Sequence, residues 1–183
     1  SFRQLRQSGM ATLWGMSENA LNRTPLFARH GQQGAKLVPF AGWEMPLHFG
    51  SILEEHHATR NSGSIFDVSH MGRLSITGSA AEGLLERVVT RKMAGMKDGQ
   101  ARYGLACQED GGTIDDLIVN RMGPEDFLVV CNGAIREAVV NHLRAHNEHG
   151  AVISDDTLGS TMVAVQGPAA VQRMTDRWPH LAE

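Results

Sequence analysis

The chain has 183 residues, 42% of them hydrophobic and 20% charged, which is typical of a soluble globular protein with a sizeable core. Its formal net charge of −3 lacks the basic excess of nucleic-acid-binding proteins, and no apolar run approaches the roughly 18 residues of a membrane span. We therefore expect neither a nucleic-acid nor a membrane partner. Cys107 and Cys131 form no CxxC pair, so we expect reduced thiols and no zinc site.

The N-terminal residues 1–23 have the character of an extension, and we expect them to be poorly ordered. Arg3 and Arg6 without preceding acids are typical of a transit peptide, whereas Met16 would serve equally as a bacterial start. The bacterial alternative implies a cytoplasmic protein and the other implies the mitochondrial matrix. Whether residues 1–15 are native stays open.

The segment 24–63 is expected to contain two helices around an extended stretch. Thr24 is the predicted hydroxyl cap of the first helix. A strand is expected over 36–40, and 42–46 should be partly irregular because glycine and proline interrupt regular structure. Ser51 begins the second helix, whose thin apolar stripe predicts partial exposure.

From residue 64 onward, strands and helices alternate. Ser79 and Glu82 form a capping box before a helix with one apolar face, and glycines at 111–112 predict a hairpin turn. The other expected elements are strands at 65–68, 74–76, 101–107, 113–121, 127–131, 152–153 and 161–165, and helices at 133–150 and 169–177.

This order predicts an α+β fold with a mainly antiparallel sheet and a ferredoxin-like succession of strands and helices. The α+β subdomain is expected to span 64–155, after a first segment at 24–63. A following subdomain should begin in 156–183 and be truncated there.

Two adjacent carboxylates, Asp115 and Asp116, precede the apolar run 117–119. An ionised acid opposes the burial that stabilises such a strand, so it is either solvated at the strand end or placed to act on a ligand. Neighbouring strand side chains point to opposite faces, so at most one should face a given pocket. The alternation of apolar residues does not say which.

Two other motifs could carry chemistry. Glu54 and His57 have the spacing of metal ligands on one helical face, but no second such pair follows, so no metal is expected. Asp67 and His70 resemble a catalytic dyad with Ser69 between them, but the sharp GxSxG turn of a serine nucleophile is absent. These polar residues are instead expected to bond the neighbouring backbone.

Three motifs follow one another along the chain: AGWEMP at 41–46, FDVSHM at 66–71 and GGTIDDLIV at 111–119. In this order they resemble the glycine cleavage system T-protein family of aminomethyltransferases. The resemblance covers most of the chain from about Thr24 to Pro168. It corresponds to the N-terminal half of the family, so the C-terminal half is absent.

The resemblance implies a tetrahydrofolate-dependent transferase of glycine catabolism. Such an enzyme takes the one-carbon unit from the aminomethylated lipoyl arm of the H-protein, releases ammonia and passes the carbon to tetrahydrofolate. The lipoylated H-protein is the implied partner. The exposed second helix could be its docking surface, with positive charge from Arg60, Arg73, Arg91, Lys92 and Lys97.

The resemblance also implies a site. The first acid of the family's IDD motif falls on Asp115, which in the family contacts the folate nitrogens and favours their attack on the carbon. Met71, Tyr103 and Asn132 fall on positions that line the folate pocket. The register at Asn132 stays open by one residue, because the strand here reads VVCN.

Two alternatives remain beside the aminomethyltransferase. One is another folate-dependent demethylase, or the folate domain of a flavoenzyme. The other is a non-catalytic folate-binding fragment, because a pocket lacking its second half admits water and weakens the electrostatics on which a carboxylate depends.

Overall fold

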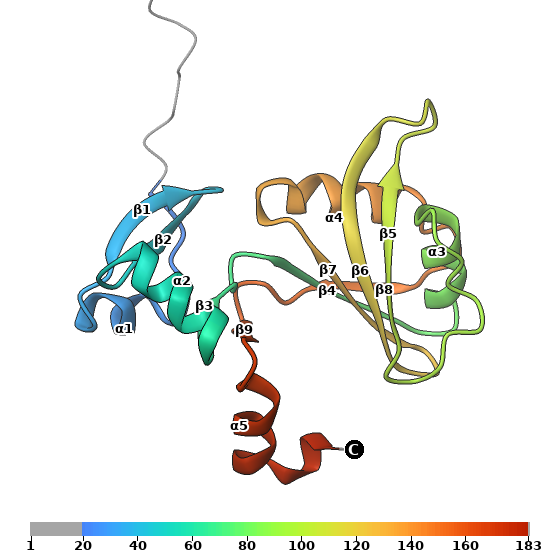
Figure 1. Cartoon of the computed structure of the whole chain (residues 1–183). Coiled ribbons are helices and arrows are strands. Elements are labelled where there is room, and N and C mark those ends of the chain that lie inside the picture. Colours follow the sequence, from blue (N-terminus) through green and yellow to red (C-terminus); the bar gives the residue numbers. More distant parts are fainter. Residues whose placement is uncertain (1–19, 183) are drawn as a thin grey trace, which may run out of the picture.

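The computed structural model describes residues 20–182, which form two groups of elements (Figure 1). The first group, which we call the sheet lobe, spans residues 72–155 and holds a five-stranded sheet. The second, which we call the hairpin lobe, comprises residues 20–67 and 163–182. The expectations for residues 1–19 lie outside the described residues.

The sheet lobe has a ferredoxin-like order of elements. Their bounds are β4 Gly72–Thr77, α3 Ala81–Val88, β5 Ala101–Cys107, β6 Thr113–Gly123, β7 Asp126–Cys131, α4 Arg136–Ala145 and β8 Val152–Asp155. The strands lie in the order β5-β6-β7-β4-β8, each antiparallel to its neighbours. Because β5 is simply added at the edge beside β6, the remaining strands keep the ferredoxin-like arrangement, which confirms the expected α+β class.

Helices α3 and α4 pack against one face of the sheet and enclose the core. Their buried residues are Ala81, Leu84, Leu85, Val88, Val139, Val140 and Leu143. The apolar spacing predicted for α3 is therefore confirmed, and each fully buried aliphatic side chain contributes about 1.5–3 kcal/mol. The opposite face of the sheet exposes Tyr103 and Ile118.

The ends of these helices differ from the predictions. Ser79 does not cap α3, because the N-cap is Ala80, which makes no side-chain hydrogen bond. A 3-10 turn, η1 (Gly133–Ile135), precedes α4. Helix α4 also ends earlier than expected, because the side chain of Asn147 bonds both backbone groups of Ala151 and closes a turn there.

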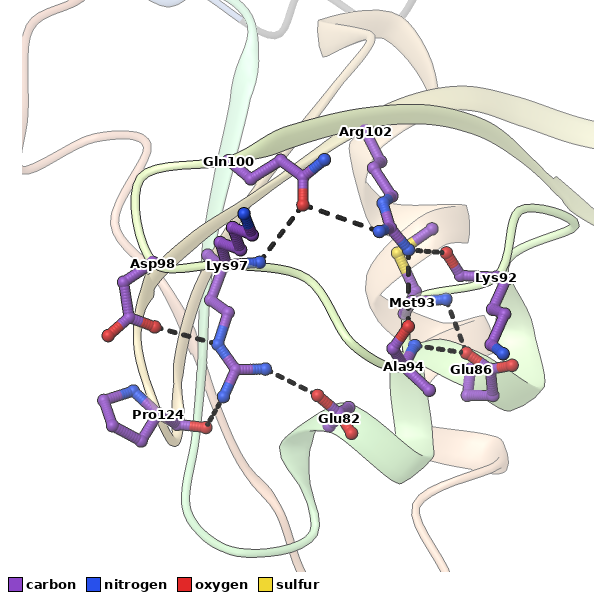
Figure 2. Close-up of polar contacts among 11 residues, drawn as sticks. Glu82, Glu86, Lys92, Met93, Ala94, Lys97, Asp98, Gln100, Arg102 and Pro124 are labelled. Carbon is purple, nitrogen blue, oxygen red and sulfur yellow. Dashed lines mark hydrogen bonds and ion pairs between the residues drawn. The ribbon is translucent and has the colours of Figure 1, made fainter.

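Hydrogen bonds to the backbone hold the loop between α3 and β5 (Figure 2). Glu86 Oε2 accepts from the N–H groups of Met93 (2.5 Å) and Ala94 (2.8 Å), and Arg102 Nη1 donates to the Lys92 carbonyl oxygen (2.5 Å). Nearby ion pairs join Arg121 to Glu82 and Asp98. These contacts fix the start of β5, one of the strands that carry predicted site residues.

The hairpin lobe consists of short elements. Their bounds are α1 Phe27–Gln32, β1 Lys36–Phe40, β2 Trp43–His48, α2 Ile52–Asn61, β3 Ser64–Asp67, β9 Val163–Gln166, α5 Ala170–Arg177 and the 3-10 turn η2 Pro179–Ala182. Strands β1 and β2 form a hairpin closed by Ala41 and Gly42, whose φ angles of 50° and 80° suit a two-residue turn. The partial irregularity expected over 42–46 is confirmed at Gly42, which lies in this turn. It is wrong for 43–46, which belong to β2, because a two-stranded ribbon with an irregular register tolerates Pro46.

Asp67 at the end of β3 ties the first helix to the rest of the lobe. Its carboxylate accepts hydrogen bonds from Thr24 Oγ1 (2.6 Å) and the Ser69 N–H (2.9 Å), and it contacts His30 Nε2 at 2.8 Å. Burial alone would raise the pKa of Asp67, but these hydrogen bonds outweigh it and lower the pKa. The predicted cap at Thr24 is therefore wrong, because its hydroxyl serves Asp67 instead of α1.

The beginning of the described chain is attached to the β1–β2 hairpin. The Asn22 backbone bonds Gly42 and Glu44, and Arg23 pairs with Glu44 at 3.0 Å. Residues 20–23 thus differ from the loosely attached extension that was expected.

Strand β3 pairs with β9 and not with the five-stranded sheet. The observed sheet lobe therefore begins at 72 and not at the expected 64, and the segment after 156 returns to the hairpin lobe. The predicted start of α2 is confirmed, since the Ser51 side chain accepts from the Glu54 N–H at 3.4 Å. No residue of α2 is buried, as its thin apolar stripe predicted.

Candidate functional site

The structure brings the four predicted site residues to one end of the sheet. Tyr103 lies on β5 and Asp115 on β6, while Asn132 directly follows β7 and Met71 directly precedes β4. These strands are consecutive neighbours in the sheet. We call Met71, Tyr103, Asp115 and Asn132 the site row.

Asp115 is held by a single partner residue. Its side chain points to the helix-covered face and the residue is only 3% exposed. Asn132 donates to both carboxylate oxygens, from its backbone N–H (2.8 Å) and from its side-chain amide (2.7 Å). A carboxylate has about four lone-pair positions, so these two bonds orient Asp115 without exhausting its capacity to accept.

Asp116 points to the opposite, exposed face, together with Ile118. It accepts from the Asn132 side-chain amide (2.8 Å) and from the Tyr103 hydroxyl (3.3 Å). Asn132 therefore bridges the two carboxylates. Lost hydration and then the negative charge of Asp116 raise the pKa of Tyr103, so that its hydroxyl keeps its proton as a donor.

Asp116 is the member of this network to which sequence reasoning gave no role. The IDD motif offered both acids, but only the strand pairing shows that Asp116 connects Tyr103 to Asn132. The adjacency of the two acids was the available signal.

A close backbone approach places Met71 beside Asn132. Gly72 pairs with Cys131, so the preceding and following residues, Met71 and Asn132, lie opposite each other. A Cβ atom at Gly133 would stand 2.2 Å from the carbonyl oxygen of His70, which leaves room only for glycine. This tight contact joins the chain before β4 to the chain after β7.

The reactivity of Cys131 tests whether water is excluded from the buried side of this site. Burial and then the charge of Asp115 raise the pKa of its thiol to about 12. Because only the thiolate reacts, we expect iodoacetamide at neutral pH to modify the half-buried Cys107 and to spare Cys131 until the protein unfolds. Peptide mass spectrometry measures both sites. Equal labelling of the two cysteines in the folded protein would contradict this placement.

The catalytic dyad of Asp67 and His70 does not form. Asp67 bonds Thr24 and His30, and the Ser69 hydroxyl donates to the Met162 carbonyl oxygen at 3.1 Å and accepts from the Met162 N–H. Ser69 is also fully buried, so it cannot reach a substrate. Asp67 and Ser69 thus bond neighbouring backbone groups as predicted, whereas the buried Nδ1 of His70 has no hydrogen-bond partner among the described residues.

The basic residues expected around α2 do not form one surface. Arg73 is buried, whereas Arg60 is exposed on α2 and Arg91, Lys92 and Lys97 follow α3 in the other lobe. Figure 1 shows α2 and α3 on opposite sides of the molecule. A docking surface that combines them is therefore excluded by the fold.

Asp115 lines none of three well-formed cavities in the described part of the chain. The largest, about 560 Å³, lies in the hairpin lobe between β2, α2 and β3. A 360 Å³ cavity next to the site row is bordered by the β1–β2 turn and the start of α4. Within the site row, Tyr103 is exposed at the sheet end, whereas Asp115 is buried.

Among the residues that the structure describes, no three His, Cys, Asp or Glu side chains gather closely enough to hold a metal ion. Within the same residues, no helix has the length and apolar character needed to cross a membrane.

Known proteins resemble this chain over most of its length. The family described as GCVT N-terminal domain matches residues 26–179. The aminomethyltransferase of Geobacillus kaustophilus is 43% identical over 159 residues, which cover 85% of this chain and 44% of the relative. The aminomethyltransferase of Rubrobacter xylanophilus is 46% identical over 156 residues, covering 85% and 42%.

A solved structure shows the same fold. The glycine cleavage system aminomethyltransferase T from Bartonella henselae superposes with a TM-score of 0.81 at 33% identity, over 86% of this chain and 44% of that one. The chain therefore spans less than half the length of the relatives it matches. The match over residues 26–179 and the shared fold together show that this chain belongs to the GCVT N-terminal domain family.

Proposed function

We propose that this chain supplies the tetrahydrofolate-binding part of a glycine cleavage system aminomethyltransferase. The supporting observation is the site row, in which Asn132 orients the Asp115 carboxylate beside Met71. The bacterial relatives named above are aminomethyltransferases by name.

The proposed reaction moves the one-carbon unit from the aminomethylated lipoyl arm of the H-protein to tetrahydrofolate, with release of ammonia. The Asp115 carboxylate accepts a hydrogen bond from a folate N–H and keeps the nitrogen lone pair directed at the carbon. Holding the two reactants in this geometry can lower the activation free energy by about 7–11 kcal/mol.

The other members of the row would shape the folate site. Met71 offers a flexible apolar side chain against a flat ring, and the 59% exposed Tyr103 offers an aromatic face at the open sheet end. Asn132 presents an amide carbonyl oxygen that can accept from a heterocycle. The bacterial relatives favour the bacterial cytoplasm as the place where this occurs.

Calorimetric titration with tetrahydrofolate tests the proposal. We expect the chain to bind tetrahydrofolate more weakly than the full-length Geobacillus kaustophilus relative, because the match covers only 44% of that relative and the remainder can supply further contacts. Ammonia release from an aminomethylated lipoyl carrier is measured in parallel. Binding without ammonia release would favour the non-catalytic fragment, and demethylation of a small N-methyl substrate would favour the demethylase. Absence of tetrahydrofolate binding, also after addition of the relative's C-terminal half, would refute the proposal.

Partner docking has a separate test. We propose that the lipoylated H-protein approaches the sheet lobe, where exposed Arg91, Lys92 and Lys97 lie on one loop. Affinity for the carrier should then decrease as salt is raised, because exposed charges are screened. Affinity that is independent of salt would exclude this surface.

A further inference from the structure

Arg73 is a buried cation whose hydrogen-bonding capacity is fully used. The residue is 5% exposed, and its guanidinium has five N–H donors. Nε donates to Ser160 Oγ at 2.8 Å. Nη1 donates to the carbonyl oxygens of Ser69 (3.0 Å) and Met71 (2.6 Å), and Nη2 to those of Thr157 (2.5 Å) and Ser160 (3.1 Å).

All five bonds end in the two segments that connect the lobes. Residues 68–71 lead from β3 into β4, and residues 156–162 lead from β8 back to β9. The same two segments bond each other where Val68 N–H donates to the Met162 carbonyl oxygen (3.0 Å). Arg73 therefore lies where the chain crosses between the lobes in both directions.

We propose that Arg73 is a positioning residue that fastens the two crossing segments to each other, and thereby fixes both the orientation of the lobes and the place of Met71 in the site row. One of the shortest hydrogen bonds of the Arg73 guanidinium ends at the Met71 carbonyl oxygen. The functional part of this inference rests on the proposed folate site, whereas the structural part does not.

The geometry requires arginine. A lysine ammonium has three donors around one point, whereas the planar guanidinium reaches acceptors in two separate segments. Each acceptor is neutral, and the carboxylates of Asp155 and Asp67 supply the nearby opposite charge. Arg73→Lys keeps the charge but leaves part of this set of carbonyl groups unpaired in a buried place.

The structural part is tested by measuring the distance between the lobes. Spin labels are attached to cysteines introduced at the exposed Arg60 of α2 and Arg144 of α4, in a Cys107→Ser background. Methyl NMR of carbon-13-labelled methionine follows Met71. We expect one narrow distance distribution in the parent protein, and a broader distribution with a shifted Met71 signal in Arg73→Lys. Arg29→Lys, at an exposed position of α1, is the matched control and should change neither.

A merely stabilising role would lower the melting temperature of Arg73→Lys but leave the distance distribution and the Met71 signal unchanged, and this result would overturn the proposal. Ser160→Ala removes the hydroxyl that accepts from Nε but keeps the Thr157 and Ser160 carbonyl oxygens that accept from Nη2. This variant should therefore fold and broaden the distance distribution less than Arg73→Lys does. If Arg73→Lys does not fold, an unchanged distribution in Ser160→Ala would overturn the proposal instead.

Folate binding separates the two proposals. Arg73→Lys is expected to weaken tetrahydrofolate binding on the order of tenfold, which corresponds to about 1.4 kcal/mol. A parent protein that binds no tetrahydrofolate, combined with a broadened lobe distance in Arg73→Lys, would refute the proposed function and leave the positioning role intact. Unchanged affinity in a variant with broadened lobe distances would overturn the link to Met71.

Discussion

Asp115→Asn is expected to abolish most tetrahydrofolate binding by this chain. Asn132 donates to both oxygens of Asp115, so an amide group in the variant must point its own NH₂ at a donor. A buried donor left without an acceptor destabilises the folded state by about 1–3 kcal/mol. This cost alone changes the equilibrium constant of unfolding roughly 5- to 150-fold. The lost charge removes the proposed acceptor for the folate N–H as well. Calorimetry measures the affinity, and chemical denaturation measures the free energy of unfolding.

The matched control is Asp116→Asn, one residue away on the exposed face. Water can replace its contacts with Asn132 and Tyr103, so both the affinity and the stability should change less than in Asp115→Asn. Equal loss of affinity in the two variants would show that tetrahydrofolate binding depends on both carboxylates and not on Asp115 alone. Unchanged affinity in Asp115→Asn would remove Asp115 from the mechanism.

Gly133→Ala is expected to destabilise the folded state by about 1–3 kcal/mol, as overpacking of a tight contact does. The new methyl group would lie 2.2 Å from the His70 carbonyl oxygen, and a backbone atom cannot move aside as a flexible side chain can. The relaxation that relieves this clash separates Met71 from Asn132, so tetrahydrofolate affinity should fall together with stability. Denaturant unfolding gives the change in free energy.

Gly83→Ala provides the control, because a Cβ at this exposed position of α3 meets nothing within 4 Å. Alanine is the better helix former by about 0.5–1 kcal/mol, so this variant should be more stable than the parent. A Gly133→Ala protein as stable as the parent would show that the two chain segments approach less closely than described here.

The periodic parts of the chain could be predicted from its sequence. The stripe at Ala81, Leu84 and Leu85 is buried as its helical spacing predicted, and the glycine turn before Thr113 joins two antiparallel strands. Such patterns depend on local geometry, in which the period of side chains along a helix or strand decides what faces the core. The family motifs added the four residues of the proposed site.

Local signals misled where a polar side chain had a distant competitor. Thr24 has the residue type of a helix cap, but the carboxylate of Asp67, 43 positions away, takes its hydroxyl. Arg73 has the charge of a surface residue, but it is buried among carbonyl groups of two segments, one of them more than 80 positions away. Neither partner can be identified from neighbouring residues.

By itself, the sequence determined the class of the fold and the succession of its elements, and it singled out the pair of adjacent acids in the proposed site. Only the tertiary structure decided that Asp115 faces the core and Asp116 the exposed side, and that Asn132 joins them. The physical reason is that a strand fixes only the alternation of its side chains. Which of the two faces becomes the inside depends on where α3 and α4 pack, and that is settled by contacts between residues far apart in the chain.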